Sequence, residues 1–168
     1  YVRDNVGVEI YAGSLRGARG TLASKAGNPL DRASLLVALL RAANPAIEAR
    51  YVQGMLSSTD ATTLVSRMFG DPSRILGCDN PAPAFNASTL IAEAQNHTWV
   101  EYRVGPSGAY TALDTAFTGA VVNQTFATAT QTFTSIPLSL RHTARIRLEV
   151  ETFTQAAASA AIARQAAS

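Results

Sequence analysis

The chain has very little cysteine and little charge, and each scarcity excludes a class of protein. Cys78 is the single cysteine among 168 residues, which excludes an internal disulfide and any zinc site built from several cysteines. Only 15% of the residues are charged, and 14 basic residues nearly balance 12 acidic ones. The basic residues are scattered, with Arg141, Arg145 and Arg147 the densest group. Because nucleic-acid binding needs a concentrated basic surface, we expect no nucleic-acid partner.

Long apolar runs are also missing. The best candidate, Leu35 to Leu40, stops at Arg41, whereas a bilayer-spanning helix needs about 20 apolar residues. We therefore expect no membrane insertion. Hydrophobic residues nonetheless make up 47% of the chain, enough for the buried core of one globular unit of this length. The chain starts at Tyr1 without Met, so we expect a segment cut from a longer or processed polypeptide.

The clearest local signal is a helix start at Asn28 and Pro29. Asn28 is a favourable N-cap, and Pro29 suits the first helical position because its missing N–H would be unpaired there. Asp31 complements the positive end of the helix dipole. Leucines within 35–40 then form a wide apolar face, and Asn44-Pro45 ends the pattern. The sequence predicts a largely buried central helix.

The remaining patterns predict an α+β fold in which this helix packs on an antiparallel sheet. Four segments alternate apolar and polar residues as strands do: 47–56, 90–104, 110–117 and 136–153. Short helices are expected within 1–22 and from Thr59-Asp60 onward, and a turn at 105–108. Residues 70–86, rich in proline and glycine, and 119–135, rich in threonine and alanine, are expected to be irregular.

A histidine and an aspartate are placed where a hairpin would bring them together. His97 lies in the second predicted strand, and Asp114 follows the turn residue Gly108 by six positions. A thiol hydrolase needs a cysteine at a helix N-terminus, an imidazole beside it and a carboxylate that fixes the imidazole tautomer. Structural readings stay open for both residues: a strand-edge histidine bonded to backbone, and a carboxylate that caps the hairpin end.

Four segments occur in the order typical of one family: 27–42, 49–54, 97–102 and 112–117. In them the chain resembles a transglutaminase-like domain of the papain-related superfamily, in the bacterial version associated with large exported proteins that carry Rhs or YD-type repeats. The family's catalytic cysteine stands four residues before the alanine that matches Ala33, a place held here by Pro29. His97 and Asp114 match the other two positions of the catalytic triad.

The resemblance also implies an organisation and a location. It predicts a transglutaminase-like, papain-like core over residues 1–118. Residues 119–168 would form a connecting segment, a C-terminal strand and an alanine-rich tail packed on the same domain. The parent protein would be bacterial and secreted or associated with the cell surface.

Two functions follow from this reading. The first is a catalytically inactive, transglutaminase-like module without cofactor or metal, which binds an extended peptide or packs against neighbouring domains of its parent protein. A purely structural spacer differs from it only in having no ligand. The alternative is an active cysteine amidase, protease or protein-glutamine acyltransferase in which Cys78 works with His97 and Asp114. Cys78 lies in a Pro/Gly-rich stretch, however, where nothing in the sequence lowers the pKa of its thiol.

Overall fold

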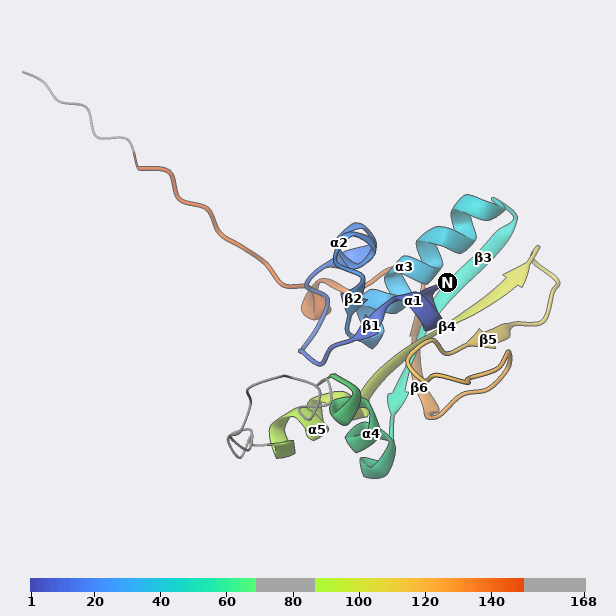
Figure 1. Cartoon of the computed structure of the whole chain (residues 1–168). Helices are drawn as coiled ribbons and strands as arrows, with labels where there is room; N and C mark the ends of the chain where they lie inside the picture. The colour runs from blue at the N-terminus through green and yellow to red at the C-terminus, as the bar shows by residue number, and fades with distance from the viewer. Residues whose placement is uncertain (69–86, 150–168) are drawn as a thin grey trace, which may run out of the picture.

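One antiparallel sheet and one long helix packed on it organise the molecule (Figure 1). The computed structural model describes residues 1–68 and 87–149. Its helices are α1 (Val2–Asn5), α2 (Gly17–Ser24), α3 (Pro29–Ala43), α4 (Ser58–Met68) and α5 (Ala87–Gln95). Its strands are β1 (Gly7–Val8), β2 (Ala26–Gly27), β3 (Ile47–Met55), β4 (Asn96–Val104), β5 (Thr111–Leu113) and β6 (Thr128–Phe133). The predicted α+β class is confirmed.

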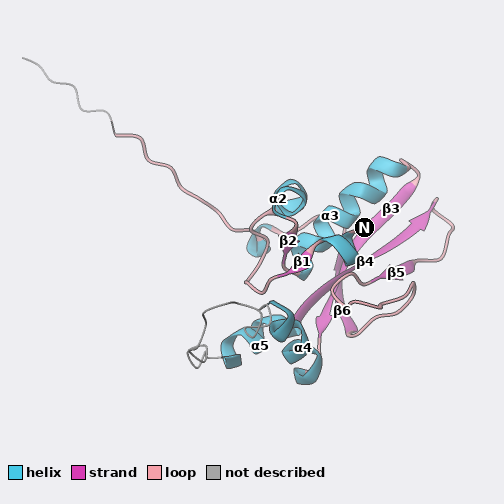
Figure 2. Ribbon diagram, viewed as in Figure 1, coloured by secondary structure: helices cyan, strands magenta, loops and turns pink. Residues whose placement is uncertain are grey.

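The main sheet has the strand order β5-β4-β3-β6, with every neighbouring pair antiparallel. Strands β3 and β4 pair over their whole length, from Ile47 opposite Val104 to Met55 opposite Asn96. Helix α3 lies across one face of this sheet, as the ribbon view shows (Figure 2). The core between them consists of six buried residues: Leu30, Ala33, Val37, Ala49, Tyr51 and Val100. The central helix therefore packs on the sheet, but mainly through Leu30, Ala33 and Val37. The predicted leucine face was wrong in part, because Leu36 and Leu40 are only half-buried and Leu39 is exposed.

A second core gathers around α4, α5 and the chain that follows β5. Its buried members are Ile10, Leu56, Ala61, Leu64, Val65, Ala94, Ala116, Phe117 and Ala120. Side chains alternate between the two faces of a strand, so His97 and Trp99 lie on the face of β4 opposite that of Val100. The His97 ring is 5.9 Å from the Phe117 ring, which places this histidine beside the second core.

Several predicted elements are confirmed. Helix α3 begins at Pro29, and the Asn28 side chain caps it by accepting a hydrogen bond of 2.8 Å from the amide of Asp31. The helix ends at Ala43, just before Asn44-Pro45. The predicted strand over 47–56 is β3, and α4 starts at Ser58, where a helix was expected. The third predicted strand is shorter than expected, because β5 covers only Thr111–Leu113.

The prediction of one strand over 90–104 is wrong in its first third. Residues Ala87–Gln95 form α5, and β4 begins only at Asn96. Leu90, Ile91 and Ala94 contact the second core. Their spacing of i, i+1 and i+4 matches one side of a helix and not one face of a strand, in which residues 90 and 91 would point to opposite sides.

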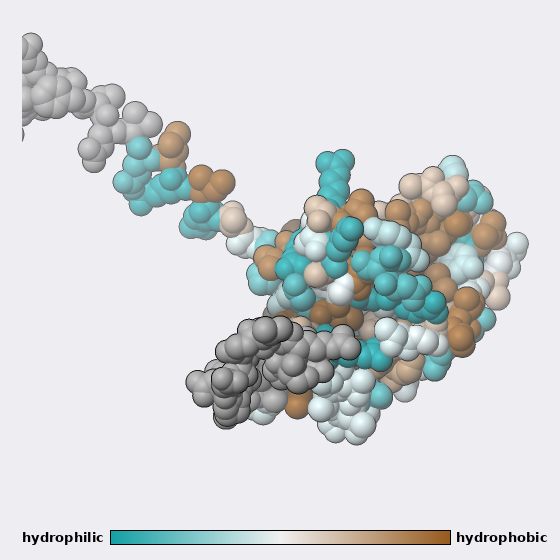
Figure 3. Space-filling model, in the orientation of Figure 1, coloured by the Kyte–Doolittle hydropathy of each residue, from teal (hydrophilic) through white to brown (hydrophobic). Residues whose placement is uncertain are grey.

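The predictions for the C-terminal part were wrong in two places. Residues 119–135 are not merely a connection, because Thr128–Phe133 forms β6 beside β3. The strand predicted over 136–153 is absent from its described part, residues 136–149, where Leu138–Leu140 forms a 3₁₀ turn. Ile146 and Leu148 alternate as in a strand, yet they are 92% and 85% exposed. Figure 3 shows this segment leaving the body of the molecule.

Cys78, the whole Pro/Gly-rich stretch 70–86 and the alanine-rich tail lie outside the described residues. Within the described ranges, no helix is both long enough and apolar enough to cross a membrane.

Candidate active site

The structure brings His97 and Asp114 together. His97 is the second residue of β4, opposite Gly54 of β3, and Asp114 directly follows β5 on the other side of β4. The imidazole Nε2 lies 2.6 Å from the carboxylate Oδ2, and neither side chain is exposed to solvent. The second carboxylate oxygen accepts a hydrogen bond of 3.0 Å from the amide of Ala116. The β4–β5 hairpin thus builds a buried imidazole–carboxylate pair.

The second nitrogen of the same imidazole has no hydrogen-bond partner. Nδ1 of His97 is buried, and nothing in the described part of the chain bonds to it. The ring stacks on Trp99 at 6.0 Å and meets the edge of Phe117 at 5.9 Å. With the Nε2 proton donated to Asp114, Nδ1 carries a lone pair that could take a proton from a nucleophile. The pair therefore has the arrangement that the resemblance implies, an imidazole oriented by a carboxylate.

The start of α3 is held rigidly but offers no nucleophile. The Asn28 amide donates hydrogen bonds of 2.8 Å to the carbonyl of Tyr11 and 2.6 Å to the carbonyl of Gly13. Pro29 is the first residue of the helix and is buried. A thiol here would benefit from the positive end of the helix dipole, whereas a pyrrolidine ring has neither an ionisable group nor a lone pair that can attack.

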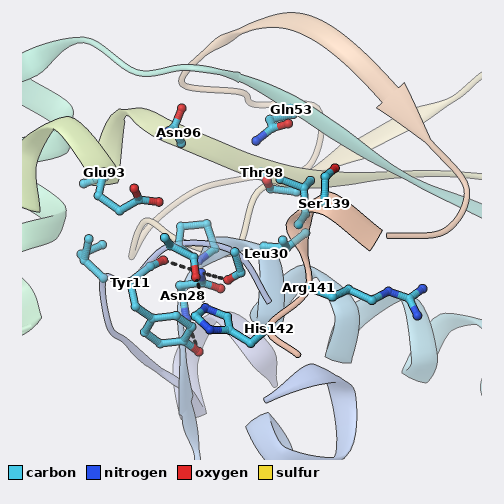
Figure 4. A pocket seen from close by; sticks show the side chains of 16 residues that line it. Tyr11, Asn28, Leu30, Gln53, Glu93, Asn96, Thr98, Ser139, Arg141 and His142 are labelled. Carbon is cyan, nitrogen blue, oxygen red and sulfur yellow. Dashed lines mark hydrogen bonds between the residues drawn. The ribbon is translucent and has the colours of Figure 1, made fainter. Parts of the chain in front are cut away.

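A cavity of about 440 Å³ opens at this helix start (Figure 4). Its walls come from five parts of the chain. The start of α3 contributes Asn28, Pro29 and Leu30, and the sheet contributes Gln53, Asn96 and Thr98. Helix α5 contributes Glu93 and Ala94. The lining is completed by the segment after β6 (Ser139, Leu140, Arg141 and His142) and by Ile10, Tyr11, Ala12 and Gly13. His97 and Asp114 do not line it, because Thr98 and Asn96 alternate with His97 along β4.

The polar groups on the cavity wall differ in their environment. Partial burial raises the pKa of Glu93 above the ordinary value of a glutamate. The His142 ring bonds to the carbonyl of Ala12 at 2.6 Å, and Figure 4 shows that ring beside Tyr11 and Asn28 while Arg141 points away from them. Among the described residues, no three His, Cys, Asp or Glu side chains gather as a metal site would require.

Asp31 has a larger role than the helix-dipole contact predicted from the sequence. Its fully buried carboxylate accepts five hydrogen bonds, from the hydroxyls of Tyr11 and Ser14 and from the amides of Leu15, Arg16 and Gly17. Burial acts to raise the pKa of Asp31, but these donors outweigh it and hold that pKa below the ordinary value. The carboxylate fixes the 11–17 loop against the start of α3.

Arg32 is a second buried charge that the sequence analysis did not single out. Its guanidinium donates to the carbonyls of Val6 and Thr115 and thereby ties α1 and the residue after Asp114 to α3. Burial lowers the pKa of Arg32 to about 10, although the nearby Asp114 carboxylate favours the charged form. The sequence feature that could have identified Arg32 as buried is its position on the same helix face as Leu35 and Leu36, where a solvated arginine is not expected.

Comparison with known proteins gives one match. A family model described as the transglutaminase-like superfamily matches residues 1–115, a range that includes α3, the strands β3 to β5 and both members of the His97–Asp114 pair. No curated protein and no solved structure matches the chain. The match covers more than half of the 168 residues and ends before β6 begins.

Proposed function

Because the chain belongs to the transglutaminase-like superfamily, we propose that it is a catalytically inactive member of that family. It serves as a binding or architectural module of a larger exported bacterial protein, of the kind that carries Rhs or YD-type repeats. Its partners are an extended peptide or neighbouring domains of the parent protein. The observation that supports the proposal is Pro29 at the first position of α3, where an attacking thiol would have to stand.

The helix start supports this assignment on physical grounds. A cysteine in such an enzyme is placed at a helix N-terminus so that the dipole and the imidazole both favour the thiolate. Asn28 caps α3 and Pro29 begins it, which is a favourable combination for helix stability alone. We infer that Pro29 stabilises the start of α3 and has no catalytic role.

The His97–Asp114 pair then has a structural use. It joins β4 to the chain after β5 and lies against Phe117 of the second core. A buried pair of this kind is costly to break once its surroundings are packed around it. It persists without catalysis because removal of either partner would leave the other buried and unsatisfied.

The experiment is an assay of the full chain for both family chemistries. The chain is incubated with a glutamine-containing peptide and a fluorescent primary amine, and amine incorporation and ammonia release are measured. The matched comparison is His97→Gln, which keeps a polar side chain but removes the base. We expect equal background signals. Turnover that survives Cys78→Ala and disappears in His97→Gln would overturn the proposal.

A second experiment tests the assignment of the nucleophile position. In a Cys78→Ala background, Pro29→Cys should place a thiol at the N-terminus of α3, and iodoacetamide labelling is then measured against pH. We expect a half-labelling pH below about 8.5, the ordinary thiol value, because the helix dipole favours the thiolate. Thr62→Cys, exposed in the middle of α4, is the control with an ordinary thiol. Identical midpoints for the two variants would contradict the assignment.

The alternative is an active cysteine enzyme that uses Cys78. The unpartnered Nδ1 of His97 is the observation that favours it, since that nitrogen is free to accept a thiol proton. The test is labelling of Cys78 by iodoacetamide against pH in the unmodified chain. A half-labelling pH well below about 8.5, with protection by a glutamine-peptide analogue, would favour the enzyme; ordinary thiol reactivity would count against it.

A further inference from the structure

A short segment beyond the family match lies along the groove at the start of α3. We call residues 137–142 the strap. Arg141 of the strap forms a parallel bridge with Ser14. The amide of Ser14 donates to the carbonyl of Leu140 at 2.6 Å, and the amide of His142 donates to the carbonyl of Ser14 at 3.0 Å. The strap therefore begins with the 3₁₀ turn Leu138–Leu140 and then pairs at Arg141 with an exposed backbone edge, as an added strand does.

Side chains reinforce this backbone pairing. The His142 ring donates from Nε2 to the carbonyl of Ala12 at 2.6 Å. Leu140 is half-buried and packs against the core between α3 and the sheet. In contrast, Leu138 is 77% exposed. The strap thus presents one apolar anchor and, two residues later, one side-chain donor.

Gly13 makes the close approach of the strap possible. Its φ angle is +63°, and a Cβ atom built there would lie 2.7 Å from the Leu140 carbonyl oxygen. Gly17 has nearly the same backbone, with φ of +59°, yet a Cβ atom there would meet nothing within 4 Å. The two glycines therefore separate the effect of backbone strain from the effect of blocking the strap.

The strap also turns the groove into a cavity. Residues 139–142 line it together with Gln53, Asn96, Thr98 and Glu93. Residues 143–149 then leave the body of the molecule, and all of them are exposed. The strap is therefore hydrogen-bonded to residues 12 and 14, whereas the chain that follows it is exposed to solvent.

We propose that the strap is the resident occupant of the groove at the N-terminal end of α3, and that an external peptide competes with it for this site. The external partner is a peptide with an apolar side chain in the place of Leu140 and a hydrogen-bond donor two residues later. This inference rests on the proposed function as a binding module and names the ligand class of its site. Because a tethered segment acts at an effective concentration in the millimolar range, a free peptide binds only after the strap is released.

The first measurement is native-state amide exchange of the full chain. In Gly13→Ala the amide of His142 should exchange about tenfold faster or more, because the new Cβ removes the strap from Ser14. In Gly17→Ala, which carries similar strain, that amide should keep its protection. Equal exchange of the His142 amide in both variants would overturn the proposal.

The second measurement is binding of a fluorescent peptide with the sequence of residues 136–145. His142→Pro removes both the amide and the ring by which the strap binds, and it changes no lining residue of the groove outside the strap. We expect this variant to bind the peptide at least about a hundredfold more tightly than the unmodified chain. Adding Gly13→Ala to it should abolish binding. Equal affinity of the unmodified chain and His142→Pro, or binding that survives in the double variant, would overturn the inference. Acyl-transfer turnover by the unmodified chain would instead overturn the proposed function.

Discussion

The imidazole of His97 and the carboxylate of Asp114 meet at 2.6 Å with no part of either side chain exposed. Strand β4 supplies the histidine, and the aspartate follows β5, so the contact closes the hairpin at the end remote from its turn. The carboxylate also accepts from the amide of Ala116. The Asp114 carboxylate therefore accepts hydrogen bonds from both the His97 ring and the Ala116 amide.

This double role predicts how Asp114 variants behave. Asp114→Ala leaves the ring nitrogen and the Ala116 amide buried without an acceptor, and we expect a loss of about 3 kcal/mol in the free energy of unfolding. Asp114→Asn retains one oxygen and should lose only about 1 kcal/mol. Urea unfolding measures both. Glu48→Gln, in an exposed ion pair with Arg103, is the control and should change stability by less than about 1 kcal/mol. Equal losses for the two Asp114 variants would contradict this account.

The hairpin and the central helix could be predicted because their signals are local. Asn28 and Pro29 mark a helix start by backbone chemistry alone, and the turn after Val104 fixes which residues of two strands lie opposite one another. The proximity of His97 and Asp114 follows from that register. Their burial does not, because it depends on Phe117 and on the second core, which residues distant in sequence assemble.

The errors arose where tertiary contacts outweigh local pattern. Strand β6 has five exposed residues in Thr128–Phe133 and no apolar alternation, so only its pairing with β3 defines it. Residues 145–149 do alternate, yet no strand lies beside them in the described structure. The role of Asp31 was missed because its five donors come from the 11–17 loop, whose approach to α3 no local signal indicates.

Asp31 should make stability depend on pH in a defined direction. Burial opposes ionisation, but the hydrogen bonds hold the folded-state pKa below the ordinary value. A lowered carboxylate pKa contributes stability that is fully present above the unfolded value of about 3.9 and is lost as the pH falls through the folded value. We expect Asp31→Asn to cost about 3 kcal/mol at neutral pH and less near pH 3. Urea unfolding at both pH values measures the difference; a cost that grows on acidification would contradict the sign.

The cap of α3 should be worth more than an ordinary helix cap. Asn28 accepts from the Asp31 amide and also donates to the carbonyls of Tyr11 and Gly13. Asn28→Ala removes all three bonds, and we expect a loss of about 2–3 kcal/mol. Ser57→Ala removes two exposed bonds with Asp60 of α4, one accepted from its amide and one donated to its carboxylate, and should cost about 1 kcal/mol. Thermal or urea unfolding compares the two.

Asn28→Asp refines the same test. The carboxylate keeps an oxygen for the Asp31 amide, but it has no donor for the carbonyls of Tyr11 and Gly13. It also adds a negative charge next to the buried Asp31 carboxylate. We therefore expect a loss of stability close to that of Asn28→Ala, although aspartate is as good a helix cap as asparagine. A variant as stable as the unmodified chain would show that only the cap bond matters.

Gly54 permits the approach of β6, and a single methyl group should prevent it. A Cβ atom at Gly54 would lie 2.2 Å from the carbonyl oxygen of Thr128 and 3.2 Å from the Trp99 ring. Neither backbone nor a buried indole can move away freely, so Gly54→Ala should destabilise the fold by about 3 kcal/mol or more. Gly7→Ala is the matched control, since its nearest atom would be at 3.6 Å in ordinary contact, and it should cost less than about 1 kcal/mol.

The two glycine variants also separate local from global effects. Amide exchange in Gly54→Ala should lose protection first between β3 and β6, while the β3–β4 pairs, which are longer and buried, keep theirs. An isolated glycine inside a strand indicates that another backbone approaches closely. Gly54 in β3 was therefore a sequence signal for β6, a strand that its own residue pattern does not predict. Loss of protection spread evenly over all three strands would show instead that β6 is part of one cooperative unit with the rest of the sheet.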